Sequence, residues 1–169
     1  MKNKILLDEY DTALICLNGH LINDSKMNES QLNQYFCEKC GEKAIEECQN
    51  CNCKIKGSYW YEDSYFIIRK DDLSQIPSYC HNCGKAFPWL QKSFEAVEEL
   101  LETEDIDIDD KKSIINSINE ITKETSKTES SVLKIKKFAT KIGSDTYDAI
   151  YKIAIDISSE MARKAFLGQ

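Results

Sequence analysis

The cysteines are the residues of this chain whose type and spacing could do chemistry. Seven of the eight cysteines and one histidine fall into four pairs of potential metal ligands. In a Cys-x-x-Cys pair, two intervening residues form a tight turn that brings both thiolates to one metal ion. A glycine directly after such a pair, as at Gly41 and Gly84, relieves the backbone of the turn. The four pairs are Cys16 with His20, Cys37 with Cys40, Cys48 with Cys51, and Cys80 with Cys83.

Eight ligands complete two tetrahedral sites, so the sequence predicts two Zn²⁺ ions per chain. Catalytic zinc keeps one position for water, whereas a site with four protein ligands is structural and contributes folding energy. Sequential pairing would build one site from the first two pairs and the other from the last two. We favour this arrangement because each intervening stretch can form a hairpin that returns the chain to its own metal. Interleaved pairing, as in RING-type cross-braces, is the alternative.

Three side chains near these pairs need a separate assignment. His20 could be a structural hydrogen-bonding residue, but the first site lacks a fourth ligand without it. His81 lies inside the last pair, and we expect it to be exposed. Cys53 follows Cys51 by two residues, and we expect a spare thiol there. A zinc ion nearby could lower the pKa of that thiol, and competition with Cys51 for zinc is the other interpretation.

Composition and charge limit the classes of protein to which the chain can belong. The 169 residues suffice for one ordinary domain or two small ones, and no apolar run reaches the roughly 18 residues of a membrane span. Cysteines at this density without an export signal indicate metal binding in a reducing cytoplasm rather than disulfides. The net charge of −7 argues against a nucleic-acid partner. With two histidines, one assigned to zinc, a Ser-His-Asp triad is nearly excluded.

The distribution of residue types predicts an α+β protein with two regions. All cysteines lie between positions 16 and 83, which predicts a tandem zinc ribbon of short β-hairpins over residues 1–93. Residues 94–169 contain no proline and predict an all-α helical region. The apolar runs Tyr59–Tyr61 and Tyr65–Ile68, around Glu62-Asp63-Ser64, indicate two strands.

Apolar periodicity predicts four helices after the ribbons, at about 89–101, 110–123, 131–142 and 145–167, with a polar loop over 122–131. The last helix is apolar on two sides. It must bury both, either by self-association or binding to a protein partner, or inside one monomer. The charge is segregated as well, with −9 over residues 95–110 and +5 over residues 111–141. Such blocks suit antiparallel helices, or a solvated face.

Several runs together resemble a bacterial family of small zinc-ribbon proteins of unknown function. They are Tyr10-Asp11-Thr12-Ala13 leading to Cys16 and Asn18-Gly19-His20, Phe36-Cys37 with Cys40-Gly41, Cys48 with Cys51-Asn52, Ile55 and Gly57, Pro77 with Tyr79-Cys80 and Cys83-Gly84, and Pro88-Trp89. The resemblance covers residues 10–92. It implies an intracellular bacterial zinc protein and brings no activity. The chain departs from the family pattern at Cys53-Lys54, where we expect Thr-Pro, and this favours Cys53 as a non-ligand.

These features favour a non-enzymatic zinc-binding adaptor or scaffold of a bacterial complex. The C-terminal helices would bind a protein partner or a second copy of the chain, and no membrane is involved. Two alternatives remain open: a nucleic-acid-binding zinc ribbon, and a RING-like or thiol-using component of a transfer enzyme.

Overall fold

The computed structural model describes residues 9–63, 66–71, 73 and 75–168. The chain divides into two compact units, Met1–Trp89 and Leu90–Gln169. The expected boundary at residue 93 lies beyond this division because Trp89 packs within the first unit. The ring of Trp89 stacks on Phe87, and its Nε1 donates to the carbonyl of Pro77 at 3.0 Å.

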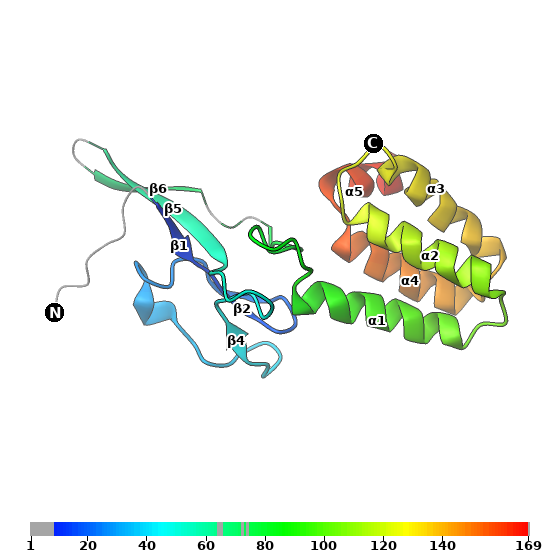
Figure 1. The fold of residues 1–169 in the computed structure, drawn as a ribbon, viewed down its shortest axis with the longest axis horizontal. Coiled ribbons are helices and arrows are strands. Elements are labelled where there is room, and N and C mark those ends of the chain that lie inside the picture. The colour runs from blue at the N-terminus through cyan, green and yellow to red at the C-terminus, as the bar shows by residue number, and fades with distance from the viewer. Residues whose placement is uncertain (1–8, 64–65, 72, 74, 169) are drawn as a thin grey trace. The chain divides into compact units, whose positions relative to one another are not determined.

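Two three-stranded antiparallel sheets organise the first unit (Figure 1). One sheet has the order β1-β5-β6, formed by Glu9–Thr12, Lys56–Asp63 and Phe66–Asp71. The other places β2 (Leu14–Cys16) between β3 (Leu21–Asn23) and β4 (Ala44–Ile45). Strands β5 and β6 form the hairpin expected from the two apolar runs, while Ser64 and Tyr65 lie outside the described residues.

A close backbone approach joins these sheets at Gly57. The N–H of Ser58 donates to the carbonyl of Asp24 at 2.8 Å. A Cβ at position 57 would lie 2.0 Å from that carbonyl oxygen, which leaves room only for glycine. The approach draws the loop after β3 onto β5, where Ser25 and Ser58 are fully buried.

The described residues of the second unit form five α-helices. They are α1 (Pro88–Glu102, whose first two residues belong to the first unit), α2 (Ile108–Ile121), α3 (Thr128–Lys137), α4 (Ser144–Ile157) and α5 (Glu160–Leu167). The short 3₁₀ turns η1 (Ser30–Leu32) and η2 (Phe138–Thr140) lie in the first and second unit. Apolar side chains from every helix meet in one core, including Leu101, Ile121, Ile135, Ala154 and Phe166.

The expected helix over 131–142 differs from α3 at both ends. The helix begins at Thr128 because the Thr128 hydroxyl accepts from the N–H of Thr125 at 3.0 Å and donates to the carbonyl of Lys123 at 2.7 Å. These bonds close the turn after α2 and shorten the predicted loop. Beyond Lys137 the chain tightens into η2 rather than continuing as an α-helix.

The prediction of one helix over 145–167 is wrong, because Ser158 and Ser159 divide it into α4 and α5. The hydroxyl of Ser159 accepts from the N–H of Ala162 and caps α5, as serine does at many helix starts. The backbone N–H of Ser159 donates to the carbonyl of Ile121 at 2.9 Å, which fixes the break against α2.

Both sides of the expected last helix pack within the chain. Tyr151 and Ile155 contact the helical core, and the ring of Tyr151 meets the edge of Phe166 at 5.3 Å. These side chains are partly buried against the core of the helical unit, so that much of the predicted apolar face is covered within the chain. Between the two charge blocks, Lys141 and Asp110 form an ion pair of 2.6 Å. None of the helices in the described part of the chain has the length and apolar character that crossing a membrane requires.

Candidate metal centres

The three Cys-x-x-Cys pairs lie on three hairpins with the same backbone pattern. In each hairpin, the residue before the first cysteine forms a β-bridge with the residue seven positions further on. The N–H of the first cysteine then donates to the carbonyl five residues on, at 2.8 or 2.9 Å. The donors and acceptors are Cys37 and Glu42, Cys48 and Cys53, and Cys80 and Lys85.

Each hairpin also needs one residue with a positive φ angle. This residue follows the second cysteine, and its N–H donates to the carbonyl of the first cysteine. Gly41 and Gly84 have φ angles of 72° and 69°. Asn52 takes the same place in the hairpin of Cys48 and Cys51 with a φ of 57°, which asparagine tolerates better than most residues. The equivalence of Asn52 with Gly41 and Gly84 was not predicted, although the pattern Cys-x-x-Cys followed by Gly or Asn could have revealed it.

Cys16 and His20 use the turn between β2 and β3 instead. Gly19 has a φ of 81°, and its N–H donates to the carbonyl of Cys16 at 2.8 Å. A Cβ at position 19 would lie 2.9 Å from the Cβ of Trp89, so a glycine is required for two reasons. The third intervening residue of this pair is accommodated by the strand turn, which brings His20 back toward the sulfur of Cys16.

The structure brings the eight predicted ligands together in two clusters. In each cluster the four potential ligand atoms lie within 4.8 Å of one another. The first cluster contains Cys16, His20, Cys37 and Cys40, and the second contains Cys48, Cys51, Cys80 and Cys83. These are the pairs in sequential order, and the interleaved arrangement is not found among the residues with a described position.

The distances inside the clusters fit a tetrahedral ion. Metal–sulfur bonds of about 2.3 Å and metal–nitrogen bonds of about 2.0 Å place tetrahedral ligands about 3.8 Å (S–S) and about 3.5 Å (S–N) apart. Sγ–Sγ distances of 3.7 Å separate Cys16 from Cys40 and Cys48 from Cys83. The Nδ1 of His20 lies 3.5 Å from the sulfurs of Cys16 and Cys37, so Nδ1 faces the centre. A disulfide requires about 2.05 Å and is excluded by these distances.

The sulfurs differ in their electrostatic surroundings. Burial raises the pKa of the Cys16 thiol and raises that of Cys48 to about 11. The pKa values of the more exposed Cys40 and Cys83 are lowered to about 6, because the backbone N–H groups of Glu42 and Lys85 stabilise their thiolates. A bound cation would favour the thiolate at all these positions, and the buried ones depend on it most.

Cys53 and His81 lie beside the second cluster and outside it. The backbone carbonyl of Cys53 closes the hairpin of Cys48 and Cys51, while the Cys53 sulfur lies 3.4 Å from Nε2 of His81. His81 is exposed, as expected. Burial, followed by the neighbouring cysteines of the cluster, raises the pKa of the Cys53 thiol. Cys53 therefore occupies a structural position of the hairpin that requires its backbone and not its side chain.

Two four-ligand clusters on hairpins, followed by a helical unit, define a double metal-ribbon protein of the α+β class. Comparison with known families identifies the group more closely. The chain belongs to the family described as "Uncharacterized protein conserved in bacteria (DUF2321)", which matches residues 9–166. The match extends over both units, beyond the ribbon residues that carried the resemblance. No curated protein and no solved structure matches the chain.

Proposed function

We propose that this protein is a zinc-dependent adaptor without catalytic activity. The observation that carries the proposal is the completeness of the two clusters, each with four protein atoms at tetrahedral spacing. Such sites hold a metal without an open position for water or substrate, and they act by stabilising a fold. A donor set of seven sulfurs and one imidazole suits Zn²⁺, and free thiols at this density suit a reducing compartment such as the cytoplasm.

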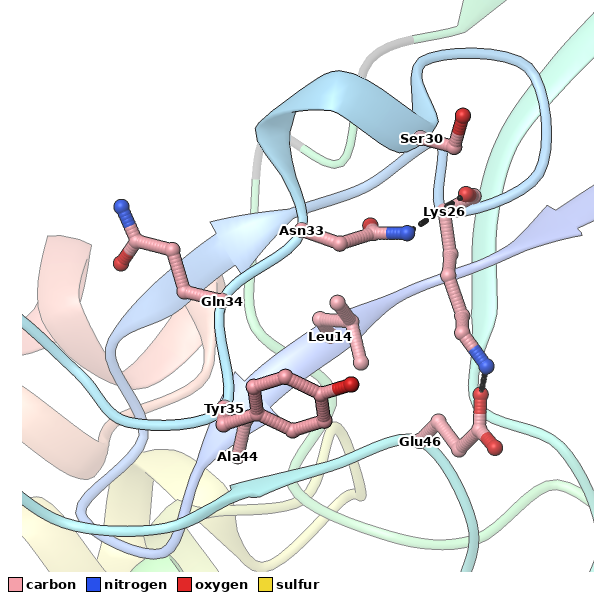
Figure 2. A pocket seen from close by; sticks show the side chains of 8 residues that line it. All are labelled: Leu14, Lys26, Ser30, Asn33, Gln34, Tyr35, Ala44 and Glu46. Carbon is pink, nitrogen blue, oxygen red and sulfur yellow. Dashed lines mark hydrogen bonds and ion pairs between the residues drawn. The ribbon is translucent and has the colours of Figure 1, made fainter.

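Exposed apolar side chains beside the first cluster support a protein partner. Leu32, Tyr35 and Phe36 precede Cys37 and are 50%, 90% and 64% exposed. Tyr35 also lines a hollow of about 550 Å³ whose apolar floor includes Leu14 and Ala44 (Figure 2). At its rim Lys26 and Glu46 form an ion pair, so the opening carries no net charge from these two residues. We assign this surface to a protein that inserts an apolar side chain, because contiguous apolar exposure on a soluble unit marks such contacts.

The helical unit offers the second contact that the proposal includes. Its wide α4 face is packed inside the unit, so a partner or a second copy would use other residues. Ile108 on α2 and Leu133 on α3 are 69% and 59% exposed and are the apolar side chains to examine.

Native mass spectrometry of the full chain, purified gently from a bacterium that encodes a family member, tests the proposal. We expect two zinc ions per chain and a stoichiometric protein partner or second copy. Tyr35→Ser/Phe36→Ser should remove a partner held by the first unit, and Ile108→Ser/Leu133→Ser one held by the helices. Both variants should retain two zinc ions. A lone chain, or a complex unaffected by either double substitution, would contradict the assigned surfaces.

A further inference from the structure

A polar groove runs between α2 and α3 in the helical unit. It has a volume of about 510 Å³ and is lined by eleven residues, all of them polar or charged. A volume of this size falls in the range of small-molecule sites. A lining without apolar side chains excludes a hydrophobic ligand and favours one that accepts and donates hydrogen bonds.

Four lysines line this groove: Lys112, Lys123, Lys127 and Lys134. In the described part of the chain, no ion pair is recorded for any of them, whereas Lys141 and Lys164 of the same unit are paired with Asp110 and Glu160. Two acidic residues, Asp109 and Glu120, also line the groove. The Glu120 carboxylate accepts a hydrogen bond from Thr125. The groove keeps an excess of two positive charges in a chain whose net charge is −7.

Neutral donors accompany the lysines. Ser131 is only 5% exposed and lines the groove, and its hydroxyl has no hydrogen-bond partner among the described residues. Asn116 and Asn119 on α2 line the same space with their side-chain amides. The Ser131 hydroxyl is not one of the fully buried unpaired atoms, so it is open to the groove, where it can donate to a ligand. Lysine, serine and asparagine side chains are among the groups that contact phosphate oxygens in proteins.

The backbone positions of the lysines are spread along the groove. Lys127, the N-cap residue of α3, and Lys134 within α3 are seven residues apart, which corresponds to about 10 Å along a helix axis. A chain of linked phosphates can contact lysines whose backbone positions are this far apart, whereas a single tetrahedral anion spans a shorter distance. We propose that the groove between α2 and α3 binds a small oligophosphate, with two or more linked phosphate groups contacted by the four lysines and by Ser131.

Isothermal titration calorimetry on the full, zinc-loaded chain tests this site with sodium tripolyphosphate, ATP and orthophosphate as probes. We expect tripolyphosphate to bind with a Kd below about 1 mM at low ionic strength and to weaken as salt is added, since the contacts are ionic. Zinc content is measured after each titration, because phosphates can also chelate the metal.

The Lys127→Gln/Lys134→Gln variant should bind tripolyphosphate at least ten-fold more weakly. The matched control, Lys137→Gln/Lys152→Gln, removes the same charge from exposed lysines outside the groove and should stay within two-fold of the wild type. Amide shifts at Ser131 and Asn116 in a two-dimensional NMR titration would place the ligand in the groove. Equal losses in both variants would mean a diffuse charge effect and would overturn the proposal.

The probes also distinguish sources of the ligand. ATP binding more tightly than tripolyphosphate would identify a nucleotide, and the reverse order would identify inorganic oligophosphate; either result supports the site. Orthophosphate binding as tightly as tripolyphosphate would contradict a site for linked phosphates. Binding of a short RNA without any binding of tripolyphosphate or ATP would overturn the small-ligand assignment, and so would the absence of binding by every probe.

Discussion

The two units of the chain stabilise their folds by different means. Among the described residues, the buried core cluster of the first unit contains seven residues, two of which are the metal-cluster cysteines Cys48 and Cys80. The corresponding cluster of the second unit contains thirteen described residues, all of them apolar and none of them cysteine. The first unit buries polar groups too, among them Asp11, Asp24 and Ser58. Its apolar core is small for a unit that spans Met1–Trp89, and proteins with small cores often need a metal or disulfides.

Because of this difference, we expect the two units to respond independently to the loss of metal. Structural zinc contributes roughly 10–16 kcal/mol of apparent binding free energy in small zinc domains, which is at least comparable with the typical stability of a whole domain, about 5–15 kcal/mol. All eight residues of the two clusters lie in the first unit. Metal is thus expected to control the order of one half of the molecule only.

Removal of both metals should have the largest effect. With a strong chelator we expect the first unit to unfold while the helices persist, so that the near-ultraviolet dichroism of Trp60 and Trp89 collapses and most far-ultraviolet helical signal remains. Both tryptophans lie in the first unit. Circular dichroism before and after chelation, followed by addition of zinc, measures this. Loss of both signals in one transition would show that the units are not independent.

A cavity in the helical core should have the opposite selectivity. Ile121 is fully buried in α2, and Ile121→Ala should lower the free energy of unfolding of the second unit by about 2–5 kcal/mol. Urea denaturation followed by far-ultraviolet dichroism measures this change. The exposed Ile108→Ala is the control and should change stability by about 0.5 kcal/mol or less. A loss of bound zinc in Ile121→Ala would contradict the independence of the two units.

Smaller effects should separate the hairpins within the first unit. Gly41 has a φ of 72° and open space around a hypothetical Cβ, so Gly41→Ala should cost about 1–2 kcal/mol from the backbone alone. Asn52 has the same conformation in the hairpin of Cys48 and Cys51, so Asn52→Gly should be neutral or slightly stabilising. Thermal unfolding of the zinc-loaded chain compares them. If Asn52→Gly proved as damaging as Gly41→Ala, the equivalence of the hairpins would be wrong.

The smallest effect concerns the pH dependence of the helical unit. Hydrogen bonds from Thr146 and from the backbone N–H of Gly143 lower the pKa of Glu104. A carboxyl whose pKa is lower in the folded state stabilises that state above its unfolded pKa of about 4.3, and this contribution is lost as the pH falls through the folded pKa. Glu104→Gln should therefore be slightly less stable than the wild type at neutral pH.

That deficit should vanish below about pH 3, where the wild-type carboxyl is protonated as well. Denaturation curves of the two proteins at both pH values measure it, with the exposed Glu99→Gln as the control. A deficit that stays constant with pH would show that Glu104 acts through its shape rather than its charge.

The ligands were accessible to sequence reasoning because their chemistry is local. A tetrahedral site needs four donors, and hairpins that return the chain within a few residues make sequential pairing the simplest arrangement. Of the sheets, only the local hairpin of β5 and β6 was accessible. The other pairings were not, because they are long-range: Tyr10 lies opposite Tyr59, and Ile15 lies opposite Ile45. Nothing in the short strands β1 and β2 specifies these partners without the metal sites that draw them together.

The helices show where periodicity misleads. The apolar spacing from Tyr147 to Met161 continues across Ser158 and Ser159, which concealed the break. The signal that could have revealed it is Ser159 followed by Glu160, a helix cap with an acidic first turn. Thr128 followed by Glu129 carries a similar signal at the start of α3. In both places the deciding contacts reach a distant backbone carbonyl, that of Ile121 or Lys123, which the sequence alone does not show.

X-ray absorption at the zinc edge of the full, zinc-loaded chain tests the central claim most directly, because it reports what surrounds each ion. We expect two zinc ions per chain, one bound by three sulfurs and one nitrogen and the other by four sulfurs, with metal–sulfur bonds of about 2.3 Å. The spectrum should not change in Cys53→Ser. A light-atom contribution larger than one imidazole would reveal a bound water and an open site. That result would contradict the structural role of the clusters and the adaptor built on it.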